Sequence, residues 1–475
     1  MQQPILLALF AVAGVIGTHQ SAAKGRRAAQ AAHALDAGFA TIGGRAAYRA
    51  LTGIRVTFAQ SRYNVGQEEW LGAAPALATT LDGIEYRDYK RPGLLTKYRL
   101  ANSPRTLTRL FLDDSAAFLV DTIVSGFGAT TPSRGYAPMF RDDPIRILRG
   151  IASAPNDGVR ELRPRTLLGR RVTGVEVGTK EDTVRLWLDA TSNVPVAIER
   201  LEDDPISAQR TTLLALTRWI SAGPVRVPGS IVVMENGKLS EAQFVSQAIA
   251  NPSVDSAFAS VPKKPSTPAS SGLTVAELAP GIYRAEGAPG GVPYNVVFAA
   301  SNDSVFVFDP PVSDSYATAV LDSVKARLPK ARARMFVVSH HHSDHVSGAR
   351  VAFAAGMTAI ASEEIAEFVR GLGVTAGTKA PANRRVVAVR DTVAIGSGAS
   401  RFVLYHVPTT HARGLVMAYF PEAKLLAEVD LAGGPLQDRR DLHDFVVRRG
   451  LVVEKLARMH GPVMPWTTFA QPFQK

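Results

Sequence analysis

The sequence predicts an α+β protein with two domains, an antiparallel β-rich domain at residues 28–250 and an αββα sandwich at residues 273–475. A chain of 475 residues is too long for one ordinary core. Its first half contains short segments of alternating apolar and polar residues, punctuated by Gly and Pro, as antiparallel sheets do. In its second half, apolar strands alternate with helical segments, which favours sheets covered by helices.

The N-terminal segment, residues 1–23, has the pattern of a secretory signal peptide. Residues 4–17 are apolar, a run shorter than the ~20 residues that a membrane-spanning helix needs. Small residues at 21–23 provide a cleavage site. Because positive charges occur at residues 24–27 rather than before the apolar run, an uncleaved anchor and a misassigned start codon stay open as alternatives. We expect a periplasmic or secreted protein.

The predicted N-terminal domain begins with a helix at residues 28–50 and continues as strands. Residues 183–188 alternate with a period of two. Asn236-Gly237 lies between two apolar runs, and this dipeptide is a strong signal for a β-hairpin. No cluster of metal ligands occurs in this half of the sequence, which therefore indicates a β-rich domain without evident chemistry.

Three segments of this half, residues 186–189, 194–199 and 225–228, resemble strands of periplasmic lipoprotein-carrier-like domains. The resemblance implies a curved antiparallel sheet round a helix, forming an apolar cup. Such a cup could bind an acyl or lipid ligand or shield a catalytic site, and an inert structural domain is the alternative. Residues 251–272, rich in Pro and Ser, form the predicted linker, because this composition cannot bury a core.

Composition and charge exclude several classes of protein. Apolar residues make up 46% of the chain and charged residues 20%, as in a globular rather than a disordered protein. The net charge of +12 would suit a nucleic-acid partner, but basic pairs such as Arg170-Arg171 and Arg448-Arg449 are scattered along the sequence. We expect no nucleic-acid partner. The chain has no cysteine, so disulfides and thiol chemistry are excluded.

The segment His340-His341-His342-Ser343-Asp344-His345 follows the apolar run at residues 335–338. Imidazoles and a carboxylate so close together at the end of a buried strand are hard to explain by folding alone. Both groups are good ligands for dications such as zinc. On an extended strand, alternate residues share a face, so His340 and His342 can point at one ion. Once the chain turns into the helix predicted at residues 345–355, Asp344 and His345 can face a second ion.

The pattern His-x-His-x-Asp-His resembles the signature of the metallo-β-lactamase superfamily. Later segments resemble the remaining ligand positions of that family, filled in the expected order by His411, Asp430 and His460. The resemblance implies two zinc ions, or iron or manganese in their place. It implies one ion on His340, His342 and His411, a second on Asp344, His345 and His460, and Asp430 as the bridge between them. It further implies that Asp309, at a strand end, orders loops and binds no metal.

The resemblance also implies a reaction. Water bound to such a metal has its pKa lowered from ~15.7 to about 7. Asp344 is the expected catalytic residue, because its carboxylate could orient the nucleophile. The expected substrate is a small molecule with an activated acyl bond (ester, lactone, thioester or lactam), or less favourably a phosphate ester. The alternative is a non-catalytic lipid- or lipoprotein-binding protein that retains the metal fold.

Three further histidines are expected to have structural roles. His341 lies between two ligands and should point to the opposite face, His406 is interpreted as a core residue, and His443 as a surface residue of an amphipathic segment at residues 442–459. Neither the substrate nor the oligomeric state follows from the sequence, because the walls of a pocket and not its metal ligands set specificity.

Overall fold

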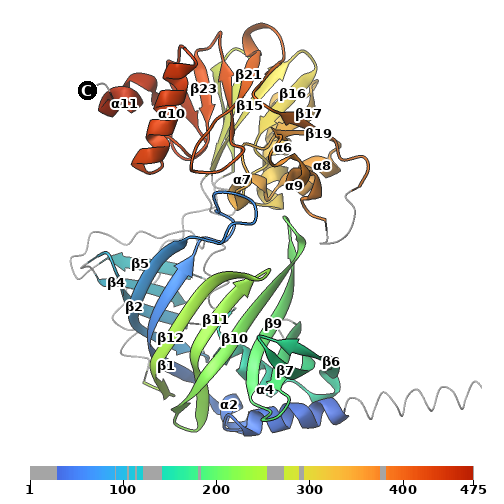
Figure 1. Cartoon of the computed structure of the whole chain (residues 1–475), viewed down its shortest axis with the longest axis vertical. Helices are drawn as coiled ribbons and strands as arrows, with labels where there is room; N and C mark the ends of the chain where they lie inside the picture. Colours follow the sequence, from blue (N-terminus) through green and yellow to red (C-terminus); the bar gives the residue numbers. More distant parts are fainter. Residues whose placement is uncertain are drawn as a thin grey trace, which may run out of the picture. The chain divides into compact units, whose positions relative to one another are not determined.

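The computed structural model describes residues 29–90, 93–103, 106–112, 115–120, 142–179, 183–253, 272–287, 294–374 and 381–473. The predicted signal segment and most of the predicted linker lie outside these residues. The chain divides into two compact units (Figure 1). The N-terminal unit comprises Met1–Tyr63, Leu77–Leu201 and Thr211–Ser266, and the C-terminal unit comprises Asn64–Ala76, Glu202–Arg210 and Thr267–Lys475. Among the described residues, no helix combines the length and the hydropathy needed to span a membrane.

The N-terminal unit contains one large antiparallel sheet, as predicted. Its strand order is β5-β4-β3-β2-β1-β12-β11-β10-β9-β8-β7-β6. The bounds are β1 (Gly53–Tyr63), β2 (Leu77–Asp88), β3 (Gly93–Leu100), β4 (Thr106–Leu112), β5 (Ser115–Val120), β6 (Val159–Leu167), β7 (Arg170–Gly178), β8 (Thr183–Asp189), β9 (Pro195–Asp204), β10 (Ala208–Ala222), β11 (Val225–Glu235) and β12 (Lys238–Ala250). The hairpin predicted at Asn236-Gly237 is confirmed: it joins β11 to β12, and both residues have positive φ, of 48° and 81°.

Helical segments pack against this sheet through apolar side chains. Residues 29–40 are helical, followed by α2 (Arg45–Ala50), and later by α4 (Pro144–Ser153) and the short 3₁₀ helix η1 (Asn156–Gly158). Leu35, Phe39 and Leu148 are fully or almost fully buried in one core with residues of the sheet. The prediction of a single helix over residues 28–50 is wrong. The chain turns at Gly43, whose φ is +114° and where a β-carbon would lie 2.5 Å from the carbonyl oxygen of Pro224.

The C-terminal unit contains two sheets. The first has the order β13-β14-β15-β16-β17-β18-β19 and the second β20-β21-β22-β23-β24-β25. The strands are β13 (Thr274–Ala279), β14 (Ile282–Gly287), β15 (Tyr294–Ser301), β16 (Ser304–Phe308), β17 (Arg332–Val337), β18 (Thr358–Ser362), β19 (Val386–Val389), β20 (Thr392–Ile395), β21 (Phe402–His406), β22 (Val416–Phe420), β23 (Leu425–Glu428), β24 (Lys455–Arg458) and β25 (Met464–Pro465). The helices are α6 (Asp314–Arg327), α7 (Ser343–Val346), α8 (Ala349–Ala354), α9 (Ala366–Gly371), α10 (Leu436–Arg448) and α11 (Trp466–Ala470), with 3₁₀ helices η3 (Gly398–Ser400) and η4 (Gln471–Phe473).

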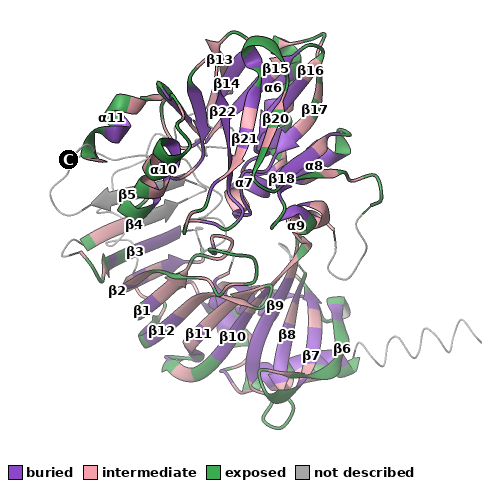
Figure 2. Ribbon diagram, turned by 45° about the horizontal axis from the view of Figure 1, so that its top comes forward, coloured by how far each residue is buried: buried purple, intermediate pink, exposed green. Residues whose placement is uncertain are grey.

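A single apolar core joins the two sheets of this unit. Buried residues, purple in Figure 2, occur along strands of both sheets. Phe308 on β16 meets Phe402 on β21 and Phe420 on β22, with ring centroids 5.1 and 5.8 Å apart. Strands β16 to β19 are parallel neighbours, and so are β23 and β24. Parallel strands end at the same edge of a sheet, so the segments that follow them gather there.

Two predicted helices differ from the observed ones. The helix expected at residues 345–355 is divided into α7 and α8 at Ser347 and Gly348. Gly348 packs closely on α6, where an added β-carbon would lie 2.5 Å from the β-carbon of Ala317. The amphipathic segment at residues 442–459 is helical only in its first part. Helix α10 ends at Arg448, Gly450 follows with φ of +62°, and the chain then forms β24.

Candidate metal centre

The seven predicted ligands come from the ends of strands in the C-terminal unit. His340 and His342 follow β17, and α7 carries Asp344 and His345. His411 lies between β21 and β22, Asp430 follows β23, and His460 follows β24. Irregular backbone after a buried strand can aim a side chain at a shared point while the strand holds its position.

The structure brings all seven side chains together in two groups. In each group, one ligand atom per residue lies within 4.8 Å of every other. The first group is His340, His342, His411 and Asp430, and the second is Asp344, His345, His460 and Asp430. Asp430 belongs to both groups, in the place of a bridging ligand.

The carboxylate of Asp430 contacts ligands of both groups. Its Oδ2 lies 3.0 Å from Nε2 of His411 and 3.4 Å from Nε2 of His340. Its Oδ1 lies 3.2 Å from Nε2 of His460, and Nε2 of His345 lies 3.2 Å from both oxygens. One carboxylate can therefore serve two cations, one on each oxygen.

Several of these atoms lack hydrogen-bond partners although they are buried. They are Nε2 of His340, Nδ1 of His342 and Oδ1 of Asp430. A buried polar atom without a partner is costly, and native proteins rarely contain one without a reason. Imidazole and carboxylate groups are suitable ligands for zinc, iron or manganese. The donor set therefore fits a divalent metal ion at each group.

Asp309 supports the site from behind His345. It is fully buried, and its Oδ2 accepts hydrogen bonds from Nδ1 of His345 at 2.7 Å and from Oγ of Ser339 at 2.8 Å. Its Oδ1 accepts a bond from the backbone N–H of Ser339 at 2.7 Å. The hydroxyl of Tyr294 also lies 2.7 Å from Nδ1 of His345. These contacts direct Nε2 of His345 toward Asp430 and Asp344.

Burial and charge divide the histidines into two kinds. Burial, reinforced by neighbouring histidines, lowers the pKa of His340 to about 3 and that of His342 to about 2. These imidazoles are neutral at pH 7, which is the form that binds a metal. At His411 and His460 burial also lowers the pKa, but nearby carboxylates outweigh it. Asp430 with Asp438 at His411, and Asp430 with Asp344 at His460, raise each pKa to about 9. A pKa of about 9 means that both rings are mostly protonated at pH 7 in the metal-free protein.

Sequence reasoning missed a group of residues that contact the ligands. Nδ1 of His411 lies 3.1 Å from Oδ2 of Asp438, on α10. Gln67 and Glu68, in the loop between β1 and β2, contact Asp344, His341 and His342. Asp438 and Tyr294 carry no signal in the sequence. The loop carries a signal in its length, because residues 64–76 are more than the two to five residues that connect the strands of a hairpin.

The remaining histidines lie outside both groups. His341 is buried, and its Nε2 lies 2.7 Å from the carbonyl oxygen of Glu68, which His342 also contacts, so the two rings do not point to opposite faces as expected. The interpretation of His406 as a core residue is wrong: it is partly exposed at the end of β21, with Nε2 3.7 Å from Oε1 of Glu364. The ring of His443 stacks on Phe473, with centroids 4.9 Å apart.

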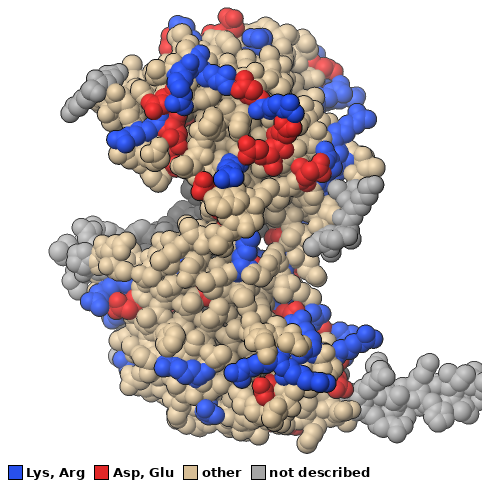
Figure 3. Space-filling model, viewed as in Figure 1, with Lys and Arg blue, Asp and Glu red and all other residues tan. Residues whose placement is uncertain are grey.

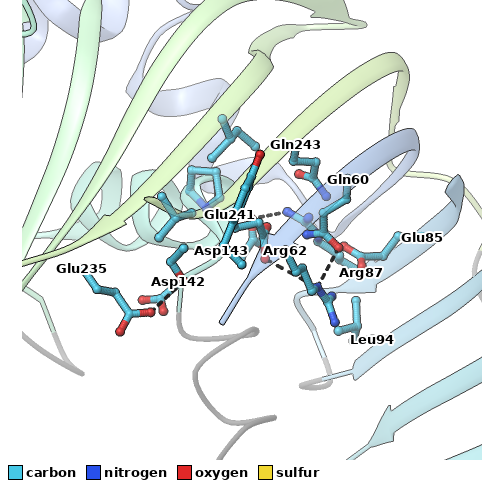
Figure 4. Close-up of a pocket in the computed structure, with 15 residues that line it drawn as sticks. Gln60, Arg62, Glu85, Arg87, Leu94, Asp142, Asp143, Glu235, Glu241 and Gln243 are labelled. Atoms are coloured by element: carbon cyan, nitrogen blue, oxygen red, sulfur yellow. Dashed lines mark hydrogen bonds and ion pairs between the residues drawn. The ribbon is translucent and has the colours of Figure 1, made fainter. Parts of the chain in front are cut away.

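A separate cavity of about 300 Å³ lies in the N-terminal unit (Figure 4). Arg87 forms ion pairs there with Glu85 and Asp143, and all three side chains are buried. Gln60 and Glu241 also line the cavity. This charged lining differs from the apolar cup that the lipoprotein-carrier resemblance implies, so that resemblance and an acyl ligand stay predictions.

A known family matches a large part of the C-terminal unit. Residues 289–457 match the family described as the metallo-beta-lactamase superfamily, a range that contains every predicted ligand except His460. The structure is similar to a metallo-beta-lactamase from Pontibacter korlensis, with 16% identity over 42% of this chain and 96% of that one and a TM-score of 0.35. It is also similar to metallo-beta-lactamase FIM-1 from Pseudomonas aeruginosa in its mono-zinc form, with 16% identity, coverages of 42% and 93% and a TM-score of 0.34. No curated protein matches the chain. The family match and the ligand groups identify a metallo-β-lactamase superfamily domain, and with it a metallohydrolase.

Proposed function

We propose that the chain is a dinuclear metal-dependent hydrolase that cleaves an activated acyl bond in a small molecule, namely an ester, lactone, thioester or lactam. The observation that carries this proposal is the position of Asp430, whose carboxylate contacts histidines of both ligand groups. The two sheets with helices packed into their common core suit the αββα sandwich of this superfamily. The bound ions would supply a water activated near neutral pH and positive charge for the oxyanion.

The ligand set supports zinc, with iron or manganese as further candidates. Five imidazoles and two carboxylates are ligands that each of these ions accepts, and the supply of metal then decides among them. His340, His342 and His411 would hold one ion and Asp344, His345 and His460 the other, with Asp430 shared. The absence of cysteine means that no thiolate replaces any of these ligands.

Asp344 is the residue that we propose to orient the nucleophile. Its Oδ1 accepts a hydrogen bond from the side-chain amide of Gln67 at 2.8 Å. Its Oδ2 lies 3.2 Å from Nε2 of His460 and 3.4 Å from Nε2 of His345. The carboxylate is therefore held on both sides, and these groups keep its pKa far below the usual value although burial opposes them. An ionised carboxylate fixed in this way can accept a hydrogen bond from an attacking water and keep it aligned.

The cellular setting is part of the proposal. The apolar segment at residues 4–17 supports export to the periplasm or beyond the cell. On the face shown in Figure 3, basic side chains are interspersed with acidic ones over the C-terminal unit.

Metal analysis combined with one ligand substitution tests the proposal. The purified protein should contain close to two metal ions and hydrolyse at least one member of a panel of esters, lactones, thioesters and lactams. His342→Ala should lose one ion and reduce kcat/KM by more than about 100-fold, because even indirect supports of a metal commonly contribute 10- to 100-fold. His406→Ala, a histidine outside both groups, is the matched control and should match the wild type. A protein that binds no metal, or a His342→Ala variant with full activity, would refute the proposal.

A further inference from the structure

The loop between β1 and β2 is longer than the hairpin requires. The two strands remain paired up to Tyr63 and Leu77, where a connection of two to five residues would reverse the chain. The chain instead forms a long loop at residues 64–76. By its contacts this loop belongs to the C-terminal unit, and Figure 1 shows it in blue beside α7. Long loops in compact domains are commonly functional.

Backbone hydrogen bonds hold the loop against the ligand-bearing segments. The carbonyl oxygen of Gly66 accepts a bond from the backbone N–H of Ser343 at 2.9 Å. The carbonyl oxygen of Glu69 accepts one from the backbone N–H of Arg413 at 2.7 Å. The guanidinium of Arg413 also lies 4.9 Å from the ring centroid of Trp70. The loop is therefore anchored next to the segments that carry Asp344 and His411.

Glu68 contacts a ligand of the first group through its backbone. Its carbonyl oxygen lies 3.1 Å from Nε2 of His342. A carbonyl oxygen can only accept a hydrogen bond, so Nε2 carries the proton and the lone pair of the neutral ring is on Nδ1. Nδ1 is the buried atom of His342 that lacks a hydrogen-bond partner. The contact thus selects the ring nitrogen that is available to a metal.

Gln67 contacts a ligand of the second group through its side chain. Its amide donates to Oδ1 of Asp344 at 2.8 Å, while Oδ2 of the same carboxylate faces His460. The bond restricts rotation of the carboxylate and leaves one oxygen for the second group. Neighbouring residues of one loop therefore orient ligands of both groups. Simple packing of a loop on a surface requires no such pair of polar contacts.

We propose that residues 64–76 are an integral part of the metal centre, in which Gln67 is a positioning residue for Asp344 and the Glu68 carbonyl sets the tautomer of His342. This inference rests on the proposed function, because it requires that these groups bind metal. The C-terminal unit would then need residues 64–76 for its metal centre, although these residues lie outside the matched family range of 289–457. Hydrogen-bond partners of metal ligands typically contribute 10- to 100-fold to metal affinity or activity.

Gln67→Met tests the positioning role, because Met has nearly the same length and shape and cannot donate to a carboxylate. Glu69→Gln is the matched control, since its exposed side chain lies in the same loop and its backbone bond is preserved. Competition with a chromophoric chelator measures metal affinity. The absorption spectrum of the cobalt-substituted protein reports the ligand field. The values of kcat and KM are measured with the substrate found in the panel. We expect Gln67→Met to bind one of the two ions 10- to 100-fold more weakly, to shift the cobalt spectrum and to lower kcat with little change in KM.

Replacing residues 64–76 by Asn-Gly, which closes a two-residue hairpin, tests the whole loop. Both ions should then bind more weakly, because contacts to both groups are removed. Wild-type metal affinity, spectrum and kcat in Gln67→Met would overturn the inference and leave the proposed function intact. Equal losses in Gln67→Met and Glu69→Gln would also overturn it, by showing a general effect of the loop. A wild-type protein without metal would overturn both proposals.

Discussion

Removing the metal ions should destabilise one of the two units and leave the other unchanged. Each unit has its own apolar core. Among the described residues, both groups of metal ligands lie in the C-terminal unit. Unfolding should therefore occur in two transitions, of which only one responds to a chelator. The physical reason is linkage, since an ion that binds only the folded unit stabilises only that unit.

The size of the shift follows from the number of sites. An ion present at about 1,000 times its dissociation constant stabilises the fold by about 4 kcal/mol. For a domain of roughly 150–250 residues, 1 kcal/mol corresponds to about 2–4 °C in Tm. One occupied site should raise the Tm of the C-terminal unit by about 8–16 °C. Two sites joined by Asp430 should raise it by up to about twice that amount.

Differential scanning calorimetry with and without a chelator measures the effect. Asp430→Asn removes the shared ligand. In this variant the transition of the C-terminal unit should respond only weakly to the chelator, and the transition of the N-terminal unit should stay at the wild-type temperature. Two transitions that both ignore the chelator would refute metal binding. Equal shifts of both transitions would refute the assignment of separate units.

Two further predictions concern protons and the support of the ligands. His411 and His460 have pKa values of about 9 in the metal-free protein, raised above 6.5. Both rings therefore favour the metal-free fold below pH 6.5, and this contribution is lost as the pH rises through about 9, while metal affinity increases over the same range. Titration calorimetry at pH 7 in buffers of different ionisation enthalpy should show proton release on metal uptake, and identical heats in all buffers would contradict it. Asp309→Asn removes the charged acceptor at Nδ1 of His345 and should weaken metal binding about 10- to 100-fold. Chelator competition measures this loss, and unchanged affinity would show that Asp309 supports only the loops.

Much of the candidate site could be predicted from the sequence because its signal is local. His340, His342, Asp344 and His345 lie within six positions, and the strand before them places them at the edge of a sheet. The structure brings His411, Asp430 and His460 to the same place, and their binding of metal stays a proposal. The hairpin at Asn236-Gly237 was equally predictable, because two adjacent residues determine the turn.

Other features depend on parts of the chain that are distant in sequence. At Gly43 and Gly348, where two predicted helices are interrupted, neighbouring segments leave no space for a β-carbon, and these tertiary contacts cannot be read from the sequence of a helix alone. Helical periodicity therefore extended the helices too far at both positions.

The sequence by itself determined the chemical groups of this protein, namely imidazoles and carboxylates in a sequence order that suits two cations. Only the tertiary structure decided how these groups are held. Asp438 reaches His411 from helix α10, and Gln67 and Glu68 reach Asp344 and His342 from a loop about 275 residues earlier. The physical reason is that ligand identity is a property of single side chains, whereas ligand orientation depends on hydrogen bonds between segments that meet only in the folded chain.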